Sequence, residues 1–144
     1  MAESRCPTDL GTNLVSELMR PAPSLVVVGW VRGHEAHELQ TTAITVAEIG
    51  YGIKRLPDGR RRVRLQAAAA ELFARFADQV LPFDAPAAEQ YASVVAGRDG
   101  SGLPIDGLDA QIAAICVAQG SMLATRNAKD FEGTGVTLTD PWAN

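Results

Sequence analysis

The chain has 144 residues, of which 47% are apolar and 21% charged, with a formal net charge of −4. This composition excludes an intrinsically disordered chain, and the length is sufficient to enclose one hydrophobic core without disulfides or structural metals. The longest apolar run, residues 25–31, is far shorter than the ~20 residues that cross a bilayer. We therefore expect a single domain over residues 1–144 with no membrane association.

The N-terminal residues and the two cysteines both bear on the cellular compartment of the protein. The first ten residues lack the apolar core of a signal peptide, so we expect a cytoplasmic protein. Cys6 and Cys116 have no CxxC or Cys/His pattern around them, and Cys116 lies among apolar residues. We expect neither a disulfide nor a zinc site, and a buried Cys116.

The distribution of charge is more informative than its sum. A net charge of −4 argues against bulk electrostatic binding of nucleic acid. Six of the 13 Lys and Arg residues, however, fall within residues 54–64, where only Asp58 opposes them. This segment is either a basic edge that follows a phosphate backbone or a solvated loop and helix start, and its charge alone does not decide between the two.

The first third of the chain alternates helical and extended patterns. Residues 12–19 predict a short helix, which a proline-rich turn ends. Residues 25–31 allow two interpretations, because three successive valines favour a strand while the apolar spacing also makes a helical face. Residues 39–41 predict a short buried strand, and Thr42 is placed to cap a helix that runs to about residue 56.

The rest of the chain carries longer helical patterns separated by short apolar runs. After a turn at residues 57–59, residues 63–78 predict the longest helix. Asp84 and Asp106 are placed to cap two further helices, the second of which covers residues 108–119 and ends at Gly120. The expected strands here are residues 80–83, 122–125 and 136–139.

Helices alternating with short apolar strands predict an α/β fold, in which a parallel sheet is covered by helices on both faces. Ligands of such folds bind beyond the carboxyl ends of the strands, where the following helices begin. The N-terminal strand is the least regular part of this pattern. Residues 5–11 include Pro7 and Asp9 and are poorly apolar for a central strand.

Three carboxylates occupy positions for which simple surface placement is not the obvious explanation. Glu48 shares a helical face with Ile44 and Tyr51, which favour burial, so its carboxylate is expected either in a functional site or in a buried ion pair with Lys54 or Arg126. Asp109 lies in the first turn of its helix, three residues after Asp106, where a capping role is the simple alternative.

Asp130 lies in the loop after the predicted strand 122–125, and by itself this position carries little meaning. All three acids can meet at one end of the sheet, where their charges repel unless a cation intervenes. An all-oxygen site suits a hard ion such as Mg²⁺, which can activate a water for attack on a phosphodiester. The sequence therefore predicts a metal site made of Glu48, Asp109 and Asp130.

Four segments in order resemble PIN domains of the VapC and FitB type: residues 12–18, residues 44–48 with Tyr51 and Gly52, residues 105–114, and residues 125–127 with Asp130 and Phe131. The match extends from about residue 10 to Trp142. The resemblance implies a PIN-like three-layer sandwich, with a short, mostly parallel central sheet and helices on both faces.

The resemblance also implies a function. Such proteins are Mg²⁺- or Mn²⁺-dependent endoribonucleases, toxins that a cognate antitoxin neutralises, and usually homodimers. Glu48 and Asp109 match the second and third acids of the family, and Asp130 matches its more variable fourth acid. Thr12 and Asn127 match polar positions that line the site and are expected to contact the RNA substrate.

The chain departs from the family at Gly11, the place where the family has an Asp at the end of the first strand. Glycine has no side chain to bind a metal, and Asp9, two residues earlier, would lie roughly 6–7 Å further back along the strand. Two other hypotheses therefore stay open. One is a PIN domain that binds antitoxin or RNA without cleaving, and the other is a receiver-like signalling domain, which also gathers acids around Mg²⁺.

Overall fold

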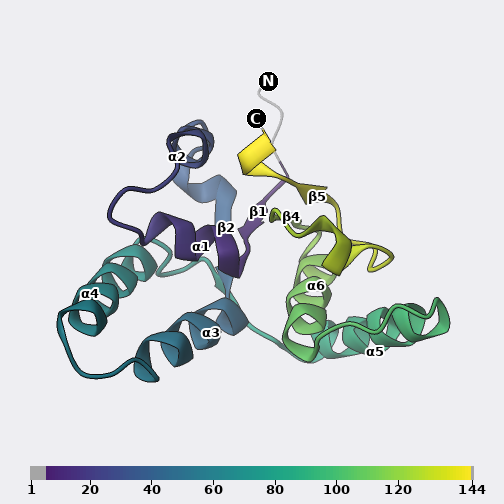
Figure 1. Cartoon of the computed structure of the whole chain (residues 1–144). Helices are drawn as coiled ribbons and strands as arrows, with labels where there is room; N and C mark the ends of the chain where they lie inside the picture. Colours follow the sequence, from purple (N-terminus) through teal and green to yellow (C-terminus); the bar gives the residue numbers. More distant parts are fainter. Residues whose placement is uncertain (1–5, 144) are drawn as a thin grey trace.

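A computed structural model describes residues 6–143 and contains, within that range, six α-helices, five strands and three short 3₁₀ helices (Figure 1). In chain order these are β1 (Thr8–Leu10), α1 (Thr12–Leu18), α2 (Leu25–Arg32), η1 (Ala36–Glu38), β2 (Leu39–Thr42), α3 (Ala43–Lys54), α4 (Arg60–Ala74), β3 (Val80–Leu81), α5 (Ala85–Gly100), α6 (Gly107–Gln119), β4 (Met122–Ala124), η2 (Ala128–Phe131), β5 (Leu138–Thr139) and η3 (Pro141–Ala143).

The five strands form one sheet in the order β3-β2-β1-β4-β5, and every neighbouring pair is parallel. β1 lies at the centre, with Asp9 opposite Gln40 of β2 and Leu123 of β4. All three residues of β1 are buried, although the sequence pattern marked this strand as poorly apolar. The predicted beginning of this strand at Arg5 lies outside the described residues.

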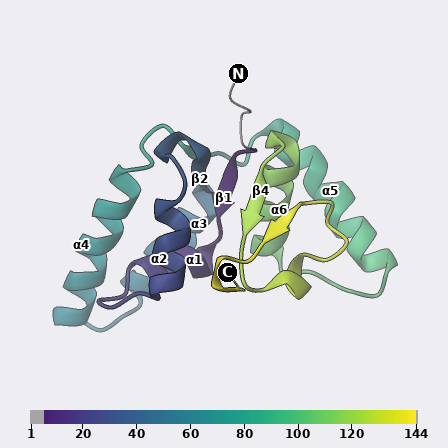
Figure 2. The same cartoon turned by 90° about the horizontal axis from the view of Figure 1, so that it is seen from above.

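Helices cover both faces of the sheet and so form three layers (Figure 2). On one face, α1 to α4 pack around an apolar cluster that includes Leu10, Leu14 and Ile53. On the other face, α5 and α6 enclose a second cluster that includes Val94, Ile112 and Leu123. The predicted α/β architecture with a short parallel sheet is confirmed.

The helix starts expected from capping residues are also confirmed. The Thr42 side chain accepts a hydrogen bond from the Thr45 N–H, and the Asp84 side chain accepts one from the Ala87 N–H. Asp106 caps α6, and Gly120 ends that helix with a left-handed backbone (φ 66°). These local signals fix where the strand-to-helix transitions occur.

The structure decides one open interpretation and corrects one prediction. Residues 25–31 form a helix, which Ser24 caps and in which only Val27 is buried, while Leu25 is 86% exposed. The longest helix is α5, not the one predicted over residues 63–78, which begins earlier at Arg60 and ends at Ala74. In the described part of the chain, no helix has the length and apolarity that a bilayer crossing requires.

Candidate active site

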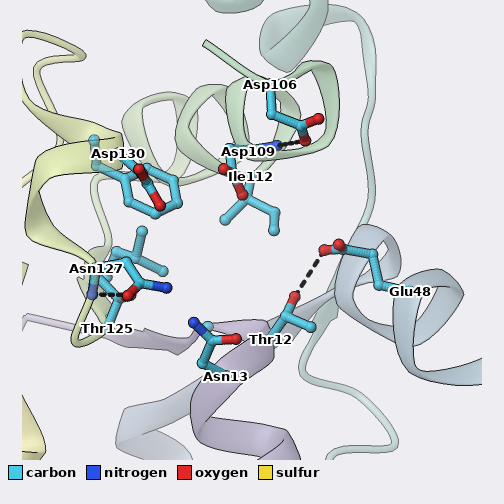
Figure 3. A pocket seen from close by; sticks show the side chains of 12 residues that line it. Thr12, Asn13, Glu48, Asp106, Asp109, Ile112, Thr125, Asn127 and Asp130 are labelled. Atoms are coloured by element: carbon cyan, nitrogen blue, oxygen red, sulfur yellow. Dashed lines mark hydrogen bonds between the residues drawn. The ribbon is translucent and has the colours of Figure 1, made fainter. Parts of the chain in front are cut away.

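The sheet topology places the predicted acids around one pocket. Because all strands are parallel, their carboxyl ends meet at one edge, where α1 and α3 begin directly after β1 and β2. α6 leads back into β4, so its N-terminus lies at that same edge. The result is a pocket of about 260 Å³ with a predominantly polar wall (Figure 3). Its polar lining side chains are Thr12, Asn13, Glu48, Asp106, Asp109, Thr125, Asn127 and Asp130.

Glu48 projects into the pocket from α3 and is held by a hydroxyl rather than by a cation. The Thr12 Oγ1 donates a hydrogen bond to Glu48 Oε1 (2.8 Å) and lies 3.1 Å from Thr45 Oγ1 (Figure 3). The ion pair with Lys54 or Arg126, the alternative from the sequence, is not formed among the described residues.

The expected burial of the whole Glu48 face is wrong. The buried side of α3 is formed by Thr45, Ile49 and Ile53, whereas Tyr51 is 68% exposed. Glu48 is therefore half-buried at the border of that side, with its carboxylate facing the pocket.

Asp109 faces the pocket from the first turn of α6. The carboxylate of Asp106, not that of Asp109, caps the helix by accepting hydrogen bonds from the Leu108 and Asp109 N–H groups. Partial burial, together with the negative charges of Asp106, Asp130 and Glu48, raises the pKa of Asp109 to about 6. The Arg98 guanidinium acts in the opposite direction and lowers this pKa. The raised pKa therefore reflects partial burial first and the neighbouring carboxylates second.

Asp130 and Asn127 come from the loop after β4. Thr125 Oγ1 accepts a hydrogen bond from the Asn127 N–H (3.1 Å), which turns the chain at the end of the strand. The turn directs the exposed Asp130, in η2, to the opposite wall of the pocket from Glu48 (Figure 3). All three predicted acids and both predicted polar residues, Thr12 and Asn127, thus line the same pocket.

Gly11 lines the pocket at the end of β1 and leaves that position without a side chain. The Gly11 N–H donates to the Ala124 carbonyl (3.1 Å), and a Cβ at Gly11 would lie 2.9 Å from that oxygen. β1 and β4 therefore approach more closely here than a side chain permits.

Asp9 does not replace the acid that is missing at Gly11. Its carboxylate is fully buried under α6 and accepts a hydrogen bond from the Cys116 thiol (3.7 Å), and it is absent from the pocket wall. Burial raises the pKa of Asp9 well above its usual value, against a smaller lowering by the Cys116 hydrogen bond, so this group favours its neutral form. Cys6 and Cys116 are free thiols, exposed and buried respectively.

The family follows from a comparison with known proteins. The family model described as "PIN domain" matches residues 11–135. The chain belongs to the PIN domain family. Its similarity extends to the VapC ribonuclease Y4jK of Sinorhizobium fredii, with 39% identity over 92% of this chain and 96% of the relative. Toxin FitB of Neisseria gonorrhoeae is 33% identical over the same shares of the two chains.

The fold comparison agrees with the sequence comparison. The crystal structure of FitAcB from Neisseria gonorrhoeae superimposes with a TM-score of 0.88 and 32% identity, covering 95% of this chain and 99% of that one. The resemblance drawn from the four sequence segments is confirmed, and the receiver-like alternative is excluded.

Three polar side chains of the pocket wall were not predicted as part of the site. Asp106 has a helix-capping pattern in the sequence, Asn13 is part of the family segment, and Thr125 ends a strand. Position relative to the strand ends is the signal that identifies them, since each lies within a few residues of a predicted strand or helix start at the sheet edge.

The wall chemistry suits a hydrated divalent cation. Within residues 6–143, no three acidic, His or Cys side chains are close enough to bind one ion directly. Mg²⁺ usually binds one or two carboxylates and keeps several waters, which bridge to more distant oxygens. Four carboxylates around one pocket and the raised pKa of Asp109 fit an ion held in that way.

A larger groove of about 800 Å³ adjoins the acidic pocket and shares Thr12, Asn13 and Glu48 with it. Its apolar lining includes Met19, Ile53 and Leu65, and its arginines are Arg20, Arg55, Arg61 and Arg126. The Arg126 guanidinium lies over the Trp142 ring, 4.5 Å from its centre. Part of the basic segment 54–64 thus borders this groove.

Proposed function

We propose that this PIN domain is an Mg²⁺- or Mn²⁺-dependent endoribonuclease, the toxin component of a type II toxin–antitoxin pair. One observation carries the proposal: carboxylates from three distant chain segments line a single pocket at the edge where the strands end. The similarity to a VapC ribonuclease and to Toxin FitB gives this pocket its chemical context.

In this proposal Glu48, Asp109 and Asp130 hold the metal, directly or through water. A bound ion would supply an activated water and would stabilise the charge that develops on the phosphate during hydrolysis. The Thr12 hydroxyl fixes the Glu48 carboxylate by its 2.8 Å hydrogen bond, and Thr12 and Asn13 line the wall that the RNA would contact. Asn127 presents its amide to the same substrate from the opposite wall.

The groove beside the pocket supplies two binding roles. Its arginines attract the phosphates of a single-stranded RNA that enters the acidic pocket. The apolar residues of the groove suit a segment of a cognate antitoxin, which would block the access of RNA to the acidic pocket. FitAB and VapBC, two similar structures, have been solved bound to DNA. For this chain we propose an antitoxin partner, and we further propose that the chain forms a homodimer. We place this activity in the cytoplasm.

The test is RNA cleavage by the purified protein with Mn²⁺ or Mg²⁺. Asp109→Asn keeps the shape of the side chain but removes a carboxylate from the pocket, so we expect it to abolish cleavage. Asp78→Asn, which removes an exposed acid outside the pocket, should cleave like the wild type. Equal, metal-independent cleavage by the Asp109→Asn protein would refute the scheme.

Gly11 favours a second candidate function, a PIN domain that binds antitoxin or RNA without cleaving. The wall lacks a carboxylate at this position, and the buried Asp9 does not supply one. Calorimetric titration with Mn²⁺ separates the two functions. Heat of binding at submillimolar metal supports the nuclease, whereas no heat at millimolar metal supports the binding protein.

A further inference from the structure

Arg98 is a buried cation without a carboxylate partner. It lies near the end of α5 with only 6% of its surface exposed, and within residues 6–143 no acid forms an ion pair with it. Burying a guanidinium is costly unless its N–H groups are satisfied. Its surroundings therefore have to explain why it is retained inside the molecule.

The guanidinium donates hydrogen bonds to backbone carbonyls of two separate segments. Its Nη1 donates to Glu132 O (2.7 Å) and Lys129 O (3.3 Å), and its Nη2 donates to Pro104 O (3.4 Å). Its Nε has no partner in the described structure. The planar, forked geometry of arginine is what allows one side chain to reach all three oxygens.

These carbonyls belong to the two segments that carry acids of the pocket. Lys129 lies within η2 beside Asp130, Glu132 directly follows η2, and Pro104 precedes the start of α6, where Asp106 and Asp109 lie. Both segments are also anchored by apolar side chains, since Phe131 is buried in the second cluster and Ile105 packs against it. The Arg98 hydrogen bonds add a polar link that joins the two backbones directly.

We infer that Arg98 is a positioning residue that fixes the spacing between Asp130 and the N-terminus of α6. This inference rests on the proposed metal site, because the spacing matters only if the acids share an ion. Arg98 does not touch the pocket itself: it acts on the backbone from behind the acidic wall. Residues that orient metal ligands in this way affect metal affinity by about 10–100-fold.

The experiment compares Arg98→Lys and Arg98→Gln with Val94→Ala. Lysine keeps the charge but not the fork, and glutamine keeps donors without charge. Val94 is buried one turn earlier on α5 and faces the apolar cluster, so Val94→Ala controls for a general loss of stability. The measurements are Mn²⁺ affinity by calorimetry and amide hydrogen exchange.

We expect Arg98→Lys and Arg98→Gln each to weaken Mn²⁺ binding at least about tenfold and to speed exchange selectively in residues 128–135. Val94→Ala should keep the wild-type affinity. Wild-type affinity in Arg98→Lys with loss only in Arg98→Gln would show that charge, not the carbonyl contacts, is responsible, and would overturn the inference. An equal loss in Val94→Ala would overturn it too.

The experiment distinguishes a failure of the Arg98 inference from a failure of the proposed metal-dependent function. If the wild type binds no Mn²⁺, the metal site fails, and the exchange measurement then decides on Arg98 alone. Unchanged exchange in residues 128–135 of both Arg98 variants would overturn its positioning role whatever the wild type binds.

Discussion

At the scale of single residues, the pocket is defined by charges that do not cancel. Asp109 reports this, because partial burial raises its pKa most and the charges of Asp106, Asp130 and Glu48 raise it further. A cation bound in the pocket would stabilise the charged form of this half-buried carboxylate. The protonation of Asp109 should therefore be linked both to folding and to metal.

This linkage predicts a pH dependence of stability for the metal-free protein. The folded pKa of Asp109 is about 6, above its usual value of 3.8, so the folded state binds the proton more tightly than the unfolded state does. The contribution of Asp109 is most favourable below about pH 4, and stability is lost as the pH rises through about 6. The melting temperature of the wild type should fall over this range more than that of Asp109→Asn.

Thermal unfolding between pH 4 and 7.5, with and without Mg²⁺, measures the effect. Asp9, whose pKa is also raised, adds a slope of the same sign in both proteins, so their difference isolates Asp109. Mg²⁺ should recover stability at pH 7 in the wild type only. Parallel pH curves for the two proteins would contradict the assignment.

At the scale of elements, the close approach of β1 and β4 explains the glycine at position 11. With the Gly11 N–H only 3.1 Å from Ala124 O, the two strands leave no room for a Cβ. The sequence revealed the missing carboxylate at Gly11. It did not reveal the contact between β1 and β4, because these two strands are more than 100 residues apart in the chain.

Gly11→Asp should therefore have two opposite effects. The new Cβ would lie 2.9 Å from Ala124 O and forces the strands to shift, which should lower the free energy of unfolding by about 1–3 kcal/mol. The added carboxylate enters the pocket wall and should strengthen Mn²⁺ binding and increase cleavage.

Gly11→Ala is the matched control, since it adds the same Cβ without a charge. Urea unfolding and Mn²⁺ titration of both variants separate the two effects: we expect equal destabilisation, and tighter metal binding only in Gly11→Asp. A gain in affinity in Gly11→Ala would show that strand spacing rather than charge limits the metal.

At the scale of the whole molecule, a basic groove leads into an acidic pocket on a protein with net charge −4. Arg55 and Arg61 border the groove, whereas Arg60 and Arg64, from the same basic segment, are exposed outside it. If the groove carries RNA, position rather than total charge decides binding.

The double variant Arg55→Ala/Arg61→Ala should bind single-stranded RNA more weakly, with a log–log salt slope that is shallower by about 0.7 for each phosphate that the protein no longer neutralises. Fluorescence anisotropy at several salt concentrations, in an Asp109→Asn background that does not cleave, gives this slope. Arg60→Ala/Arg64→Ala removes the same charge and should have little effect. Equal weakening in the two double variants would mean that the groove does not guide RNA.

The sequence alone determined the features that depend on local chemistry. Capping residues located the starts of α3, α5 and α6, apolar runs located β2, β3, β4 and β5, and three acids of the sequence marked the pocket wall. Such signals act over a few residues, so they can be read along the chain.

The tertiary structure decided whatever depends on distant neighbours. Residues 25–31 form a helix that buries only Val27, and a polar β1 is the central strand, with β2 and β4 on its two sides. The burial of Asp9, the strand contact at Gly11 and the carbonyl contacts of Arg98 all join segments far apart in the chain. No local pattern encodes them, because only packing brings those atoms together.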